Sequence, residues 1–347
     1  MRALITGATG FVGRSLVEDL LDRGHDVRVL APDARGARAL LPEAVAVHPG
    51  APADEDSVRN ASSGVDTIFH LAESEHPSSH RSYESYSQNL LGTTNILSAA
   101  ELDTRISRIV IQSSIAATGP SRDGLPLTEE SELRPLTNYG RCQANMEVAA
   151  LRHRAETGSP VVIIRSAMTY GEGDRNWQPF FELIEKSSRH GLPLLIPGRH
   201  RNLSDFCYVK NLTRGMIDAA QSENTVGRTY FLSDARPYTF QEIIDAVAGA
   251  YHLEPPRRSL PRAPLLGASH VLDALAGIFG FTSPLTPRGV RWMTTNYWIC
   301  SCGKARTDFG YSPEFDLVAG LGRTVRWLEN GAAVPRGAGR EESPVEE

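Results

Sequence analysis

The feature that most constrains the fold of this chain is a glycine-rich turn between a short apolar strand and an amphipathic helix, close to the first residue. The predicted strand covers residues 2–6, and the turn is Gly7-Ala8-Thr9-Gly10-Phe11-Val12-Gly13. Apolar residues then recur at helical spacing up to Gly24, which is predicted to end the helix before a second strand at 26–30. Backbone amides at the start of such a helix bind a diphosphate, and glycine lets the backbone approach it closely. The pattern therefore predicts one half of a nucleotide-binding parallel sheet.

The rest of the chain continues the alternation of strands and helices. Short apolar runs that suit buried parallel strands lie at 67–71, 109–113 and 161–165, with helical stretches around 85–102 and 139–157 between them. This order predicts an α/β fold with a Rossmann-type doubly wound parallel sheet.

Prolines become frequent after about residue 170 and break the regular rhythm. We therefore expect a dinucleotide-binding core over residues 1–170, to which later strands at about 203–233 return, and a smaller C-terminal substrate lobe over about 171–330. Residues 331–347 are rich in Gly, Pro, Arg and Glu and are expected to be a disordered tail.

Composition excludes several classes of protein. The net charge is -5 without a block of one sign, so no nucleic-acid partner is expected. No run of 18 apolar residues occurs, so no stable membrane insertion is expected. The cysteines are Cys142, Cys207, Cys300 and Cys302. They are too few and too scattered to predict a disulfide framework or a metal site, and a reduced cytoplasm is the expected compartment.

Several motifs together resemble the extended short-chain dehydrogenase/reductase superfamily, in its NAD-dependent epimerase/dehydratase or 3β-hydroxysteroid-dehydrogenase-like branches. The glycine turn with Thr6 before it and Phe11 within it has the spacing typical of these proteins. The other matching segments are His70-Leu71-Ala72, Asn89-Leu90-Leu91-Gly92-Thr93, Ser113-Ser114 with Gly119, Arg165 with Tyr170-Gly171, and Asp205-Phe206-Cys207-Tyr208-Val209 with Asn211.

The resemblance implies roles for particular residues. Ser114, with Ser113 as the alternative, would hydrogen-bond the substrate oxygen, Tyr139 would transfer a proton, and Asn89 would support the site through water. The residues implied to bind a nicotinamide cofactor are Gly7, Thr9, Gly10, Phe11, Val12, Arg35, Leu71, Ala72, Tyr139 and Gln143.

One position departs from the pattern, because Gln143 stands four residues after Tyr139, where the superfamily carries lysine. Both side chains face the same side of a helix, and a glutamine amide can still hydrogen-bond a ribose hydroxyl. Without a nearby cation, however, a tyrosine keeps a pKa of about 10 and stays protonated at neutral pH. Reduction of a carbonyl needs a proton donor and should suffer less than oxidation of an alcohol, which needs a base. Arg141 is two residues from Tyr139 and should point to another side of the helix.

The choice between NAD and NADP depends on the end of the second strand, where an acid favours NAD and an arginine favours NADP. Asp33 comes late, and Arg35 and Arg38 follow it, so we lean slightly to NADP. The acidic residues at 54–56 are expected to form a solvated turn.

The sequence thus predicts an NAD(P)-dependent oxidoreductase that interconverts a ketone and an alcohol on a bulky small molecule, with the apolar stretch 263–281 as a helix over the pocket mouth. One alternative is a nucleotide-sugar epimerase or dehydratase, for which Arg199, Arg201 and Arg291 would bind a diphosphate. Another is a nucleotide-binding protein or non-redox catalyst that has lost the lysine. By resemblance, a homodimer could form through the helices at 85–102 and 139–157.

Overall fold

The computed structural model describes residues 1–71, 87–192, 196–197, 202–255, 259–260, 262–279 and 297–330. The expected tail at 331–347, the predicted cofactor contact Ala72, and Arg199, Arg201 and Arg291 lie outside the described residues.

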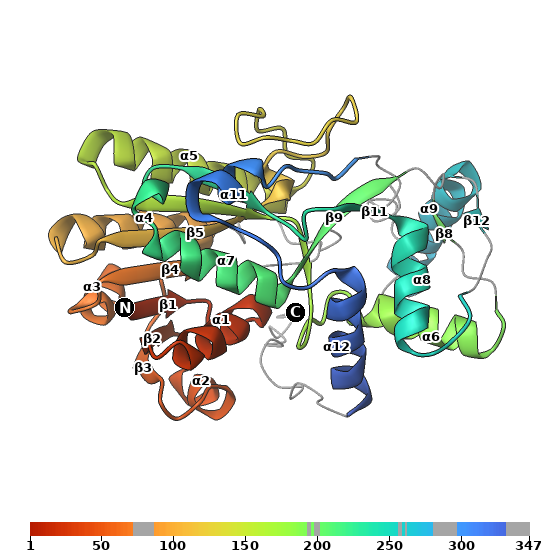
Figure 1. Ribbon diagram of the computed structural model, residues 1–347, viewed down its shortest axis with the longest axis horizontal. Coiled ribbons are helices and arrows are strands. Elements are labelled where there is room, and N and C mark those ends of the chain that lie inside the picture. Colours follow the sequence, from red (N-terminus) through yellow and green to blue (C-terminus); the bar gives the residue numbers. More distant parts are fainter. Residues whose placement is uncertain are drawn as a thin grey trace.

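A seven-stranded sheet forms the centre of the protein (Figure 1). Its strands are β1 (Arg2–Thr6), β2 (Asp26–Ala31), β3 (Ala46–Pro49), β4 (Thr67–Leu71), β5 (Arg108–Ser114), β6 (Val161–Ser166) and β10 (Thr229–Leu232). All neighbouring strands are parallel and their order is β10-β6-β5-β4-β1-β2-β3. The predicted Rossmann-type α/β fold is confirmed. The order reverses between β1 and β4, and ligands of such sheets bind at this point, outside the carboxyl ends of the strands.

Helices cover both faces of the sheet. Successive strand side chains point to opposite faces and therefore belong to two separate buried clusters. Val110 and Val162 face the cluster that includes α1 (Phe11–Asp22), α2 (Ala34–Leu40) and α7 (Val209–Gln221). Ile109 and Ile111 face the cluster that includes α3 (Glu55–Ser62), α4 (Ser87–Leu102) and α5 (Asn138–Thr157). Every residue of β4 is buried, as expected for a central parallel strand.

The second part of the chain builds a smaller sheet of β7 (Met168–Tyr170), β9 (Leu203–Tyr208) and β11 (Pro237–Thr239), in the order β11-β9-β7. Of the strands expected at 203–233, β10 completes the main sheet, whereas β9 pairs in this smaller one. The helices near it are α6 (Gln178–Arg189), α8 (Phe240–Ala250) and α12 (Leu317–Glu329), and α11 (Gly303–Phe309) lies beside β10. A two-stranded sheet joins β8 (Ile196–Pro197) and β12 (Ser259–Leu260).

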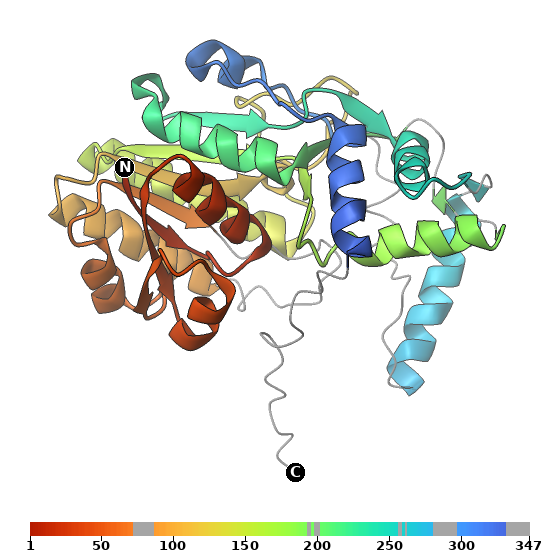
Figure 2. The ribbon, with the colours of Figure 1, turned by 60° about the horizontal axis from the view of Figure 1, so that its bottom comes forward.

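The helix expected at 263–281 is present as α9 (Arg262–Phe279). Figure 2 shows that it extends away from both sheets, and Val271 on it is 60% exposed. Its role in covering a pocket therefore stays a prediction.

Asp234 links the two sheets just after β10. Its Oδ1 accepts hydrogen bonds from the backbone N–H of Tyr208 at 2.9 Å and from Nδ2 of Asn211 at 2.7 Å. Asn211 in turn donates to the carbonyl of Phe315 at 2.7 Å and accepts from the backbone N–H groups of Glu314 and Phe315. Through Asn211, the Asp-Phe-x-x-Val-x-Asn segment thus connects the residues before α12 to Asp234 at the end of the main sheet.

All four cysteines are free and buried. Within the described ranges, no helix has the length and apolar character needed to cross a membrane. The same residues contain no group of three or more His, Cys, Asp or Glu side chains that could hold a metal ion.

Candidate active site

The glycine turn forms a tight loop at the carboxyl end of β1, and one face of this loop is exposed. Gly7 has φ of +73°, and a Cβ on it would lie 2.7 Å from the carbonyl oxygen of Leu71, the last residue of β4. A Cβ on Gly13 would lie 2.2 Å from the carbonyl oxygen of Gly7. Glycine is therefore required at both positions, and the loop holds β1, β4 and the start of α1 together.

The predicted cofactor contacts are distributed around this loop. Gly7, Thr9 and Gly10 are exposed, Phe11 is half-buried, and Val12 and Leu71 are buried. Gly10 precedes the first turn of α1 without a side-chain cap, so the loop leaves backbone N–H groups for a ligand. The exposed face of the loop and its free backbone N–H groups are compatible with a bound diphosphate.

Ser114 ends β5, and its Oγ accepts a hydrogen bond of 3.1 Å from the backbone N–H of Ala116. This contact leaves the hydroxyl hydrogen available to donate to a substrate oxygen. Ser113 instead donates to the buried carboxylate of Glu147. Of the two serines considered, Ser114 is therefore the one whose geometry suits a ligand.

Tyr139 lies in the first turn of α5, which begins after Thr137 with a hydrogen bond from the Gly140 N–H to the threonine Oγ1. A Cβ on Gly140 would lie 2.3 Å from the carbonyl oxygen of Ala116, in the 3-10 turn at Ile115–Ala117. Glycine next to the tyrosine thus lets α5 approach the turn that holds Ser114. The start of α5 and the end of β5 meet at the same edge of the sheet.

Gln143 lies one helical turn farther along α5 and is only 1% exposed. Its Oε1 has no hydrogen-bond partner among the described residues. A buried acceptor without a donor is unfavourable, so this position is suited to a ligand that donates a hydrogen bond, such as a ribose hydroxyl.

No lysine of the chain replaces the missing one. Each of the three lysines lies near a carboxylate. Lys186 lies near Glu182, Lys210 lies near Glu18 and Asp19, and Lys304 lies near Glu130. Arg141 is exposed and donates to Oδ1 of Asn138 at 2.7 Å, which agrees with its expected direction away from the site.

A buried ion pair fixes the middle of α5 to the sheet. The guanidinium of Arg165 on β6 donates from Nε and Nη2 to Glu147, with the shortest contact at 2.7 Å. Glu147 is fully buried and also accepts from Ser113. Glu147 was not predicted from the sequence, although it follows Gln143 by one helical turn and must therefore share its inward face.

Asn89 is half-buried at the start of α4 and lies beside α5. Burial raises the pKa of the Cys142 thiol to about 11, and a hydrogen bond with the Asn89 side chain acts in the opposite direction. Asn89 thus reaches the neighbouring helix, but its expected support of the site through water stays a prediction.

A buried histidine connects Asn89 to the glycine loop. His70 Nδ1 lies 2.7 Å from Oγ1 of Thr6, and its Nε2 lies 3.0 Å from Oγ1 of Thr93. Thr93 donates its hydroxyl to the carbonyl of Asn89 at 2.8 Å, so Nε2 must carry the hydrogen and Nδ1 must accept from Thr6. Burial lowers the pKa of His70 to about 4, which keeps the ring neutral at pH 7.

Asp33, which follows β2, has a structural role at the start of α2. Its side chain caps α2 by accepting from the backbone N–H of Gly36 at 2.9 Å. Arg35 is exposed in the first turn of the same helix. The acidic residues at 54–56 are exposed, as expected, but they start α3 and do not form a turn. Asp54 caps the helix, and Arg59 pairs with Glu55 and Asp56.

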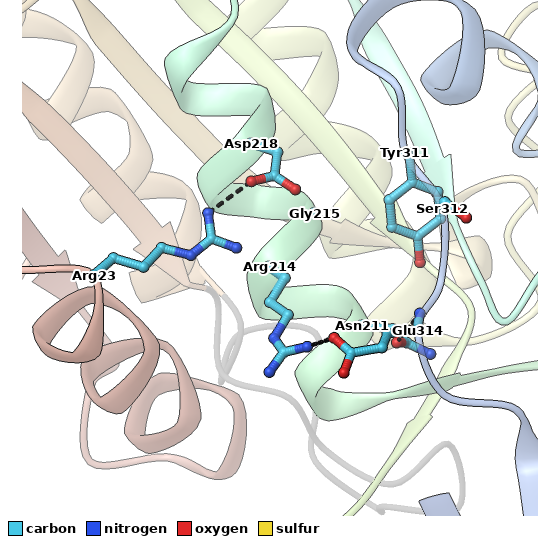
Figure 3. Close-up of a pocket in the computed structure, with 8 residues that line it drawn as sticks. All are labelled: Arg23, Asn211, Arg214, Gly215, Asp218, Tyr311, Ser312 and Glu314. Atoms are coloured by element: carbon cyan, nitrogen blue, oxygen red, sulfur yellow. Dashed lines mark hydrogen bonds and ion pairs between the residues drawn. The ribbon is translucent and has the colours of Figure 1, made fainter. Parts of the chain in front are cut away.

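A polar pocket of about 350 Å³ lies elsewhere, along α7 (Figure 3). Ion pairs occupy its wall, between Arg23 and Asp218 at 2.7 Å and between Arg214 and Glu314. Arg23 follows the last residue of α1, at the opposite end of this helix from the glycine loop. None of the residues predicted for the cofactor or for catalysis lines this pocket.

Comparison with known proteins agrees with this geometry. Residues 3–232 match the NAD dependent epimerase/dehydratase family. The chain is 31% identical over 337 residues to the 3 beta-hydroxysteroid dehydrogenase/Delta 5→4-isomerase of Mycobacterium tuberculosis, covering 90% of this chain and 86% of that protein. It is 28% identical over 341 residues to the 2-alkyl-3-oxoalkanoate reductase of Stenotrophomonas maltophilia, covering 93% and 98%.

Among solved structures, the UDP-glucose 4-epimerase of Thermus thermophilus in complex with NAD is similar to this chain, with a TM-score of 0.72. The comparison covers 96% of this chain and all of the other, at 24% sequence identity. At this identity the likeness establishes the fold alone.

Proposed function

The chain belongs to the NAD-dependent epimerase/dehydratase family, and on this premise we propose that it is a nicotinamide-dependent oxidoreductase that reduces a ketone on a bulky small molecule. The observation that most supports the proposal is the close approach of Gly140 to Ala116, which brings the elements carrying Tyr139 and Ser114 to one edge of the sheet. The relatives named as a hydroxysteroid dehydrogenase and an oxoalkanoate reductase support it independently.

In this proposal, the glycine loop holds the cofactor diphosphate and the Oε1 of Gln143 accepts a hydrogen bond from the nicotinamide ribose. The nicotinamide supplies the hydride when it is bound. Ser114 donates its hydroxyl hydrogen to the substrate carbonyl oxygen, and Tyr139 donates the proton that completes the alcohol.

The neutral Gln143 favours one direction of the reaction. A neutral phenol can donate a proton to the alkoxide that forms, whereas the phenolate needed to oxidise an alcohol is favoured by a nearby cation, which Gln143 does not supply. We therefore propose that carbonyl reduction is the physiological direction.

For the cofactor we keep the slight preference for NADP(H), with Arg35 at the exposed start of α2 facing a 2′-phosphate. Dissociation constants of NADPH and NADH, for the native protein and for Arg35→Gln, test this. Equal losses for both cofactors in the variant, or a native preference for NADH, would contradict it.

The central experiment follows nicotinamide oxidation with a panel of cyclic and long-chain ketones, and alcohol oxidation in reverse. Native protein, Tyr139→Phe and Gln143→Lys are compared, with Arg141→Lys as the control that adds a lysine on the exposed side of α5. We expect native reduction, a loss of at least about 100-fold in Tyr139→Phe, and a larger gain in oxidation than in reduction for Gln143→Lys.

Other outcomes would favour the alternatives. No hydride transfer by the native protein with any ketone or alcohol would favour a non-redox role. NAD that copurifies with the protein and does not exchange would favour an epimerase or dehydratase.

We also propose a homodimer through the outer faces of α4 and α5. Leu91 is 46% exposed there, and Val148 is 54% exposed beside an open groove of about 490 Å³. Light scattering should give a dimer for the native protein and a monomer for Val148→Arg.

We also propose that the protein resides in the reduced cytoplasm, which the buried free cysteines support. Fractionation of the native host would test this.

A further inference from the structure

The helix α9 carries an exposed apolar stripe. Its four residues lie on one side of the helix, within about 100° of arc, because they recur at the spacing i, i+3, i+4 and i+7. They are Ala268, Val271, Leu272 and Leu275. Val271 is 60% exposed and Leu275 is 38% exposed, while Ala268 is exposed and Leu272 is half-buried. The apolar side of α9 therefore faces solvent.

The polar residues Ser269, His270 and Asp273 project from the opposite half of the helix. Among the side chains described on α9, at 266–275, the buried one is Ser269, whose hydroxyl donates to the carbonyl of Leu266 at 2.8 Å. A helix that packs on a protein core buries its apolar side. The preceding helix α8 does so with four residues, Ile243, Ile244, Val247 and Ala248. Packing on the core thus does not explain the orientation of α9.

The position of α9 makes it accessible to a large partner. Figures 1 and 2 place this helix at the opposite end of the molecule from β1, β2 and β3, and Figure 2 shows it extending past α6. It has 18 residues, and a rise of about 1.5 Å per residue gives it a length of about 27 Å. An extended, flat surface can therefore contact the stripe along the helix.

Positive charge is concentrated around α9 in the sequence. Residues 256–296 contain five arginines and one acidic residue, Asp273, which gives a net charge of +4, whereas the whole chain has a net charge of -5. Arg262 is the first residue of the helix, and Arg257 and Arg258 precede it closely in the chain. A second copy of the chain would bring the same positive charge to the contact, whereas anionic lipid headgroups complement it.

We propose that α9 binds the surface of an anionic lipid bilayer, with the apolar stripe at the boundary between headgroups and acyl chains. An apolar side combined with nearby arginines is typical of helices that lie in the plane of a membrane. The helix rests on the bilayer and does not cross it, in agreement with the lack of a spanning helix in the described ranges. The inference does not involve the glycine loop and is independent of the proposed reaction.

Sedimentation of the full chain with vesicles of equal parts phosphatidylcholine and phosphatidylglycerol tests this. We expect the native protein to bind, and the stripe variant Val271→Gln/Leu275→Gln to bind at least about tenfold more weakly, because it loses two aliphatic side chains from the contact. Glutamine keeps a high helix propensity. The matched control is His270→Gln/Ala274→Gln, which places two glutamines at exposed positions of the same helix outside the stripe and should bind as the native protein does.

The contribution of charge is measured separately. Arg257→Gln/Arg258→Gln should weaken binding to the anionic vesicles about 10- to 30-fold, and rising salt should weaken binding of the native protein. Vesicles of phosphatidylcholine alone should bind the native protein more weakly than the anionic ones.

An environment-sensitive fluorophore shows which side of the helix meets the lipid. The native cysteines are buried and do not compete for the label. A nitrobenzoxadiazole group on Val271→Cys should shift its emission to the blue when anionic vesicles are added. The same group on His270→Cys should shift less.

Four results would overturn the inference. They are absence of native binding to anionic vesicles, equal binding by the stripe variant, equal native affinity for the two kinds of vesicle, and self-association that the stripe variant loses in light scattering without vesicle binding by the native protein. The last result would assign the stripe to a second copy of the chain. If the stripe variant does not fold by circular dichroism, the arginine variant, whose substitutions lie outside α9, decides the question. Because these assays measure no ketone reduction, their failure would leave the proposed function intact.

Discussion

At the scale of single residues, Gln143 combines burial with an incomplete set of hydrogen bonds. It is only 1% exposed, and within the described structure its Oε1 accepts nothing. Leaving such an acceptor unpaired costs about 1–3 kcal/mol. A residue that only packs at this position would be apolar, which supports the proposed hydrogen bond from the cofactor ribose to the amide.

Replacing Gln143 with methionine should therefore separate stability from binding. We expect Gln143→Met to increase the free energy of unfolding of the ligand-free protein by about 1 kcal/mol and to weaken cofactor binding about tenfold. Urea denaturation and cofactor titration measure the two effects, with Arg141→Met on the exposed side of the helix as control. A variant that is both less stable and unchanged in binding would show that the amide has a structural role.

At the scale of elements, the position of α5 decides where Tyr139 lies. Thr137 caps its start, Gly158 ends it with φ of +78°, and the buried pair of Glu147 and Arg165 fixes its middle to β6. A further contact is at Gly140, whose missing side chain leaves room for the Ala116 carbonyl.

Gly140→Ala should move the start of α5 away from Ser114, because its Cβ would lie 2.3 Å from the Ala116 oxygen. Displacements of about 1 Å lower rates by up to about 100-fold, so we expect kcat to fall by at least about tenfold while the affinity for ADP-ribose changes little. Gly249→Ala in α8 has free space around its Cβ and is the control. Equal turnover in both variants would contradict the importance of this contact.

The sequence predicted those elements whose signals are local. The strand, glycine turn and helix over residues 2–24 agree with β1, the loop and α1, because their apolar spacing and glycines are specified within the segment itself. The pairing of β9 outside the main sheet and the contact from Arg14 to Gly173 depend on residues far apart in the chain. The capping role of Asp54 was missed because the acidic run was interpreted by charge alone.

At the scale of the whole molecule, buried carboxyl groups lie where the two sheets join. Burial raises the pKa of Asp234 to about 7, with Asp205 adding to the shift, and burial raises the pKa of Asp205 itself to about 6. Each group holds a proton more tightly in the folded state than in the unfolded one. The stability that they contribute is full below the unfolded pKa of about 4 and is lost as pH rises through their folded pKa values.

Asp234→Asn should remove part of this pH dependence. Between pH 5 and pH 8, the free energy of unfolding of the variant should rise relative to the native protein by about 2 kcal/mol, at about 1.4 kcal/mol per pKa unit. The asparagine Oδ1 can still accept from Tyr208 and Asn211. Urea unfolding across this range measures the difference, with Asp56→Asn, whose side chain is 82% exposed, as control. Parallel curves for Asp234→Asn and native protein would refute the expectation.

Burial of every cysteine gives the protein a chemical property that does not depend on its activity. In the folded protein, no thiol is accessible to maleimide or iodoacetamide. Labelling therefore requires local or global unfolding of the protein. Cys142 is 2% exposed and directly precedes Gln143, so its rate of modification reports how often α5 separates from the sheet. A single cysteine introduced on the surface would be modified first and would give one defined position for a fluorophore.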